Sequence, residues 1–207
     1  MATSERFEKA LIYATRLHVS KNGSAMSYIS HLLSVSGIAV EYGADEDEAI
    51  AALLHGAIKD AGDKGAAKVR DEIRNQFGEI VLEIVNGFTE TDVYPISHLP
   101  GQREDYLTHF RNSSSSVRFI LAADKLQNAR CILKDYRELG EQIWNNFKGG
   151  REGTLWYYCT LIEEFRKGMD SPIAEELARV VTEIGKLADA RKCGARLAAM
   201  DMPKIFQ

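Results

Sequence analysis

Residues 28–31 read YISH, residues 51–60 read AALLHGAIKD, and residues 120–128 read ILAADKLQN. Each stretch combines apolar residues with one side chain of a type that binds metal ions, namely His31, His55 and Asp124. The apolar neighbours would carry each of these polar groups inward on a helix. Three such groups on three separate helices are typical of a site built inside a helical bundle. The pattern therefore predicts an all-α fold organised around one polar site.

The rest of the chain also predicts a succession of helices. Apolar residues recur at three- and four-residue spacing, which is the helical period. The expected helices cover about residues 4–20, 29–42, 47–60, 67–77, 79–88, 102–111, 117–136, 143–147 and 155–165, and the last one opens at Ser171-Pro172. Asp45 with Glu48 predicts an N-terminal capping pair. Residues 62–65 and 89–101 are expected to be loops, and the second is long enough to cover a site.

No linker, repeat or low-complexity segment divides the sequence. We therefore expect a single domain over residues 1–207, with its core at about 5–140. Helices at about 141–193 would pack on that core, and residues 194–207 form a weakly patterned tail.

Composition excludes several classes of protein. The chain has 207 residues, of which 45% are apolar and 27% charged, as in ordinary soluble proteins. A net charge of −4 gives no reason to expect nucleic acid or an anionic membrane as a partner. No apolar run approaches the roughly 20 residues that span a bilayer. Three widely spaced cysteines, Cys131, Cys159 and Cys193, indicate reduced thiols in a cytoplasmic protein.

The three stretches together resemble the HD superfamily of metal-dependent phosphohydrolases. Within that superfamily they are similar to the hydrolase domain of RelA/SpoT homologues and to the small alarmone hydrolases, with matching order and spacing over about residues 5–140. Residues 147–158, FKGGREGTLWYY, resemble a bacterial subgroup of small HD proteins. The resemblance implies an HD-type multi-helix bundle. It also implies removal of the 3′-pyrophosphate from a purine nucleotide such as guanosine tetraphosphate.

The resemblance further implies roles for particular residues. His31, His55 and Asp124 match the ligands of a divalent ion, manganese or another. Asp60 matches one member of the acidic pair that orients the attacking water, and Lys59 stands at the position of the other. Lys125 and Asn128 match positions near the nucleotide, and Lys21 lies in the loop that supplies basic residues to it.

Two residues depart from this family pattern in the site itself. Gly56 stands where the family has the aspartate of its His-Asp pair, and Lys59 stands where it has a glutamate. The pocket gains three units of positive charge relative to the family, and the lost carboxylate should weaken binding of a hard divalent ion. A glycine inside a helix also costs about 1 kcal/mol relative to alanine.

Three functions remain open from the sequence. The first is a metal-dependent phosphohydrolase, in which Asp60 or a further water replaces the missing carboxylate. The second is a catalytically inactive, metal-free relative that binds a nucleotide or a protein partner, with Lys59 pairing with Asp124 or Asp60. The third is a purely structural or partner-binding helical protein, in which the site residues are relics. Lys59 and Asp60 could also be simply the solvated end of a helix. A homo-oligomer is compatible with each of them.

Overall fold

The computed structural model describes residues 4–19, 25–92, 107–168 and 171–200, and this part of the chain is helical without any strand. The helices are α1 (Glu5–Val19), α2 (Ala25–Glu41), α3 (Glu46–Leu54), α4 (Ala57–Phe77), α5 (Glu79–Asp92), α7 (Ser115–Leu139), α8 (Gly150–Gly168) and α9 (Pro172–Met200), with the 3-10 helix η1 (Gly140–Asn146) after α7. Residues 107–112 are helical as well. The prediction of an all-α fold is confirmed.

Local chemistry explains where several helices begin. The Glu48 backbone N–H donates to Asp45 Oδ1 at 2.8 Å, and the Asp45 N–H donates to Glu48 Oε2 at 3.1 Å, so the predicted capping box is present at α3. At α7 the Val117 N–H donates to the Ser114 hydroxyl at 3.2 Å. Caps of this kind each contribute about 1 kcal/mol and fix the first turn of the helix.

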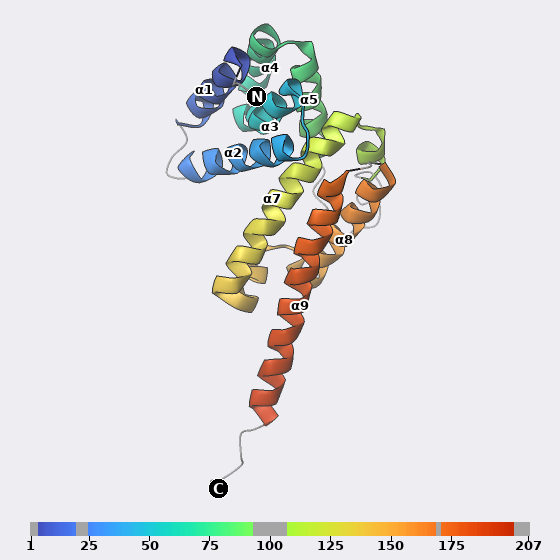
Figure 1. Cartoon of the computed structure of the whole chain (residues 1–207). Coiled ribbons are helices and arrows are strands. Elements are labelled where there is room, and N and C mark those ends of the chain that lie inside the picture. The colour runs from blue at the N-terminus through green and yellow to red at the C-terminus, as the bar shows by residue number, and fades with distance from the viewer. Residues whose placement is uncertain (1–3, 20–24, 93–106, 169–170, 201–207) are drawn as a thin grey trace.

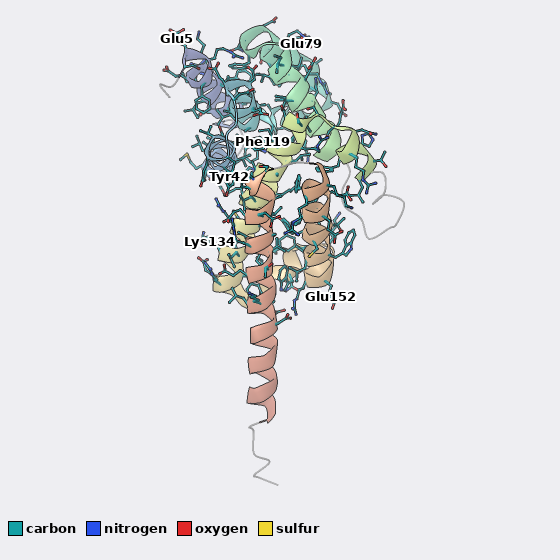
Figure 2. All side chains as sticks on the ribbon, turned by 45° about the vertical axis from the view of Figure 1, so that its right-hand side comes forward. Glu5, Tyr42, Glu79, Phe119, Lys134 and Glu152 are labelled. Carbon is teal, nitrogen blue, oxygen red and sulfur yellow. The ribbon has the colours of Figure 1, made fainter. Side chains whose placement is uncertain are left out.

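The helices form two groups that α7 connects (Figure 1). Helices α1–α5 gather at one end, with α3 packed against α1, α2 and α5 and buried along residues 49–54. Helix α7 starts beside this group and continues along α9, which packs against both α7 and α8, and α8 also contacts α7. Figure 2 shows Glu5 and Glu79 on the first group and Lys134 and Glu152 on the second. Because α7 crosses from one group to the other, a residue near its middle can meet side chains of α2 and α3.

The predicted single helix over residues 47–60 is wrong. Helix α3 ends at Leu54, His55 is its C-terminal cap, and α4 begins at Ala57. Ala57 and Ile58 are 2% exposed, so the buried apolar run continues through the break and the sequence pattern conceals it. Gly56 thus lies at a junction between two helices instead of inside one.

The predicted loop at residues 62–65 is wrong as well. Gly62 has a φ of 63°, which is the left-handed region, and it kinks α4 without ending it. Glycine reaches this conformation at little steric cost. The helix therefore changes direction here and continues to Phe77.

The C-terminal region is more regular than the sequence suggested. Helix α9 continues past residue 194 to Met200 and extends beyond the other helices (Figures 1 and 2). Most of the predicted 89–101 loop and the first part of the predicted 102–111 helix lie outside the described residues, although α5 extends to Asp92. Over the described residues, no helix is both long enough and apolar enough to cross a membrane.

Candidate metal and nucleotide site

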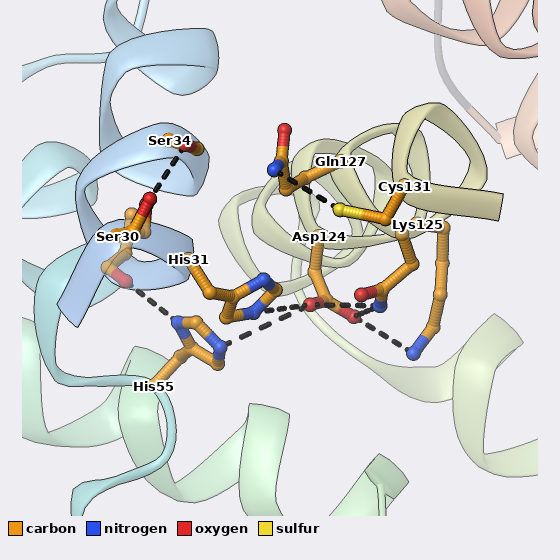
Figure 3. A network of polar contacts seen from close by, with 10 residues as sticks. Ser30, His31, Ser34, His55, Asp124, Lys125, Gln127 and Cys131 are labelled. Carbon is orange, nitrogen blue, oxygen red and sulfur yellow. Dashed lines mark hydrogen bonds and ion pairs between the residues drawn. The ribbon is translucent and has the colours of Figure 1, made fainter. Parts of the chain in front are cut away.

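Three side chains from three helices converge at the junction of the two groups. His31 comes from α2, His55 from the end of α3, and Asp124 from the middle of α7. His31 Nε2 lies 3.1 Å and His55 Nε2 lies 3.9 Å from the same Asp124 oxygen, Oδ1. The two imidazole rings meet edge to face with centroids 5.4 Å apart. Figure 3 shows both imidazoles on one side of the Asp124 carboxylate.

His55 is held in one orientation by its surroundings. Its side chain is 5% exposed, its ring packs on Phe88 with centroids 4.6 Å apart, and its Nδ1 lies 2.6 Å from the Ala52 carbonyl oxygen. A proton on Nδ1 satisfies that carbonyl and leaves the Nε2 lone pair directed at the pocket. Burial lowers the pKa of His55, which keeps the ring neutral at pH 7. A neutral imidazole with a free lone pair can bind a metal ion.

Asp124 is a buried carboxylate with partners on both sides. The Lys125 ammonium lies 2.8 Å from Oδ2, and the Asn128 amide donates to both carboxylate oxygens at 3.2 Å. Burial by itself would raise the pKa of Asp124, but the Lys125 charge and the contacts with His31 and His55 hold it well below its usual range. The group is therefore ionised, and one oxygen faces the histidines while the other faces Lys125 (Figure 3).

These residues border a pocket of about 250 Å³. Its lining combines the three convergent residues with ammonium, amide, hydroxyl and aromatic groups: Tyr28, His31, His55, Gly56, Lys59, Asp60, Phe88, Thr89, Asp124, Lys125 and Asn128. Lys59 is exposed and Asp60 is half-buried at the start of α4. A pocket with two lysines and two aspartates can attract an anionic group while it retains a carboxylate for a cation.

Gly56 is in close contact with Tyr28. A Cβ atom added to Gly56 would lie 1.8 Å from the Tyr28 hydroxyl oxygen and 3.2 Å from its Cζ. The same point is 3.4 Å from Asp60 Oδ2. The tyrosine hydroxyl therefore occupies the space that the side chain of any other residue 56 would need.

Most of the candidate site residues come together in this pocket. His31, His55, Lys59, Asp60, Asp124, Lys125 and Asn128 all line it. Lys21 lies outside the described residues. Tyr28, Phe88 and Thr89 also line the pocket, and the sequence pattern gave them no role. The motif that contains His31 begins with Tyr28, which was the available signal for this residue. The sequence pattern indicated Phe88 only as the apolar end of a predicted helix.

The donor set fits a divalent transition-metal ion. The candidate ligand atoms of His31, His55 and Asp124 lie within 4.8 Å of one another. Two ligand atoms that are each about 2.1 Å from one ion are at most about 4.2 Å apart. Both distances from the histidines to Asp124 are within that limit, and the two histidine nitrogens lie within 4.8 Å of each other. Two imidazoles and one carboxylate suit ions such as manganese or zinc.

Comparison with known proteins gives a consistent result. The sequence model of a family described as the HD domain matches residues 10–155. A GTP pyrophosphokinase of Streptomyces coelicolor is 34% identical over 173 residues, which are 82% of this chain and 19% of that protein. A guanosine-3′,5′-bis(diphosphate) 3′-pyrophosphohydrolase of Aquifex aeolicus is 30% identical over 132 residues, 62% of this chain and 18% of that protein. The chain thus spans less than a fifth of the length of these two relatives.

The fold is shared with a solved structure. A metazoan ortholog of SpoT that is described as hydrolysing ppGpp superimposes with a TM-score of 0.67 at 20% identity. The match covers 89% of this chain and 98% of that protein, so it extends past the part that the family sequence model covers. With the family match over residues 10–155, these findings show that the chain belongs to the HD domain family.

Proposed function

We propose that this protein hydrolyses the 3′-pyrophosphate of a purine nucleotide such as guanosine tetraphosphate, with a divalent ion, preferably manganese, held by His31, His55 and Asp124. The observation that carries the proposal is the convergence of these three ligand atoms within 4.8 Å of one another. The pocket beside them also contains Lys59 and Lys125. The similarity to a named guanosine-bis(diphosphate) 3′-pyrophosphohydrolase supports the choice of substrate.

Each residue has a defined task in this proposal. A bound divalent ion would supply Lewis acidity and lower the pKa of a water molecule. His55 and Asp124 are pre-positioned by the Ala52 carbonyl and by the Asn128 amide, so little ordering would be needed on binding. Asp60 lines the pocket and is assigned the role of accepting a proton from the attacking water. Lys59 and Lys125 attract the negative pyrophosphate. The main role of Asn128 is to orient Asp124.

A metal-free nucleotide-binding protein is the second candidate. Two observations favour it. Gly56 supplies no oxygen ligand, and the ammonium of Lys125 already lies 2.8 Å from Asp124. The sequence suggested Lys59 as a cation that pairs with Asp124 or Asp60, and the structure adds Lys125 as a lysine in contact with Asp124. A buried acid that is already paired with a lysine has less need of a metal ion for its stability.

Pyrophosphate release from guanosine tetraphosphate tests the two candidates against each other. The metal-stripped chain is first titrated with manganese by calorimetry and then assayed for pyrophosphate with and without the ion. We expect one bound ion and release of pyrophosphate only when manganese is present. The absence of manganese binding would exclude the metal-dependent hydrolase. Nucleotide binding without any manganese binding would favour the second candidate.

The assay has a matched control variant. His55→Gln removes one candidate ligand and keeps a side chain of similar size, so it should abolish both manganese binding and hydrolysis. His109→Gln changes a histidine that does not line this pocket, and it should leave both unchanged. An equal loss in the two variants would show that the activity does not depend on the proposed site.

A further inference from the structure

The Tyr28 hydroxyl occupies a place that is normally available to a side chain. Gly56 has φ −90° and ψ −9°, a conformation that any residue can adopt. Its backbone therefore does not require glycine. A side chain at residue 56 would collide with the tyrosine, whose oxygen would lie 1.8 Å from the added Cβ, so the tyrosine would have to move.

The position of Tyr28 is set by its neighbours. Its ring stacks beside that of His31 at a centroid distance of 6.1 Å, and the two residues lie one turn apart on α2. Tyr28 is half-buried and lines the pocket together with His55, Gly56 and Asp60. The hydroxyl thus lies at the wall of the pocket, between the end of α3 and the start of α4.

We infer that Tyr28 replaces the missing side chain of residue 56 and donates a hydrogen bond to a phosphoryl oxygen of the bound ligand. This inference rests on the proposed function, because it assigns a role to Tyr28 in that same pocket. A phenol carries one O–H group that can donate a hydrogen bond to a phosphoryl oxygen. A carboxylate at residue 56 would instead repel an anion and attract a cation.

The replacement changes what the pocket binds best. The hydroxyl joins Lys59 and Lys125 as a third donor toward an anionic group. Hydrogen bonds to charged groups contribute more than neutral ones, so the exchange of a carboxylate for a phenol favours a pyrophosphate group at the expense of the metal ion. Tyr28 is therefore a determinant of the balance between anion and cation binding.

Thermal melts test whether Tyr28 really fills this space. A glycine-to-alanine change at a compatible backbone position ordinarily stabilises a protein slightly. We expect Gly56→Ala to lower Tm by roughly 3 °C instead, because the new Cβ displaces the hydroxyl. In the Tyr28→Phe background only the contact with Cζ at 3.2 Å remains, so Gly56→Ala should lower Tm by much less. Equal Tm shifts in the two backgrounds, or a rise in both, would overturn the packing part of the inference.

Binding of inorganic pyrophosphate tests the role of the hydroxyl. Tyr28→Phe keeps the ring and removes the donor, so we expect roughly tenfold weaker binding of pyrophosphate in the presence of manganese. Binding of manganese alone should change by less than about twofold, because the hydroxyl is not among its ligands. The control is Tyr42→Phe, which removes the hydroxyl of another half-buried tyrosine near the end of α2, outside the pocket.

The outcomes separate this inference from the proposed function. If Tyr28→Phe binds pyrophosphate as tightly as the unmodified protein, the role of the hydroxyl is overturned and the proposed function stands. If the unmodified protein binds neither manganese nor pyrophosphate, the proposed function fails and the ligand role of Tyr28 fails with it. An equal loss of pyrophosphate binding in Tyr42→Phe would also overturn the assignment.

Discussion

Two buried acids in this protein, Asp124 and Glu164, have different surroundings. They are 4% and 5% exposed, and each is in contact with lysine. Glu164 on α8 accepts two hydrogen bonds from the Arg111 guanidinium, at 2.7 and 3.0 Å, and one from Lys167 at 3.0 Å. Asp124 has Lys125 at Oδ2 and two histidines at Oδ1, and the Asn128 amide donates to both oxygens.

The difference shows which buried acids make a site. Both oxygens of Glu164 are engaged by permanent cations, and the Arg111 hydrogen bonds hold its pKa at about 2, despite a burial that would raise it. This arrangement joins α8 to the helical residues 107–112. One oxygen of Asp124 instead faces two imidazoles, those of His31 and His55. Burial of an acid alone therefore does not indicate a candidate metal site, whereas its convergence with two imidazoles does.

The sharpest test neutralises each acid in turn. Asp124→Asn should weaken manganese binding by about 100-fold or more, because loss of a ligand costs at least as much as loss of a group that orients one. Glu164→Gln is the matched control and should bind manganese like the unmodified protein. Calorimetric titration of both metal-stripped variants provides the measurement. Similar manganese affinities in the two variants would show that Asp124 is no more a metal ligand than Glu164 is.

The second test concerns stability. Glu164→Gln should lower the free energy of unfolding by about 2 kcal/mol at pH 7, a value reduced by solvent screening of the half-exposed Arg111. Because the pKa of Glu164 lies below the ordinary 4.5, its contribution is complete above pH 4.5 and disappears as the pH falls toward 2. Urea denaturation at several pH values should therefore show the two proteins converging in acid.

The exposed neighbour Glu163 supplies the control for that experiment. Glu163→Gln should change the unfolding free energy by less than about 0.5 kcal/mol at any of these pH values. If Glu164→Gln has an equally small effect at pH 7, the contacts with Arg111 and Lys167 do not stabilise the fold. The contrast between a stabilising role for Glu164 and a ligand-binding role for Asp124 would then be wrong.

The smallest effect should come from the charge at the rim of the pocket. Lys59→Glu changes that charge by two units, and we expect manganese affinity to rise about fivefold at low salt and less at high salt. Lys64→Glu makes the same change at an exposed position on α4 outside the pocket, and it should have little effect. A salt-independent increase, or an equal one in both variants, would mean that Lys59 does not act on the site through its charge.

Sequence alone determined the features that depend on neighbouring residues. The capping box at Asp45 and Glu48, the Ser114 cap and the apolar period along α7 are set within a few residues of chain, and the structure contains all of them. His31, His55 and Asp124 could also be named in advance, because each stands within a recognisable short motif. The HD family relationship follows from the same short motifs.

Only the tertiary structure decided what happens where distant segments meet. The break between α3 and α4 lies inside a continuous apolar run, so periodicity could not show it. The position of the Tyr28 hydroxyl beside Gly56 depends on how α2 packs against α3 and the junction that follows it. The pairing of Arg111 with Glu164 joins residues 53 positions apart. Local hydrogen bonds and periodicity carry short-range information, whereas the occupant of a space between helices depends on how the whole chain packs.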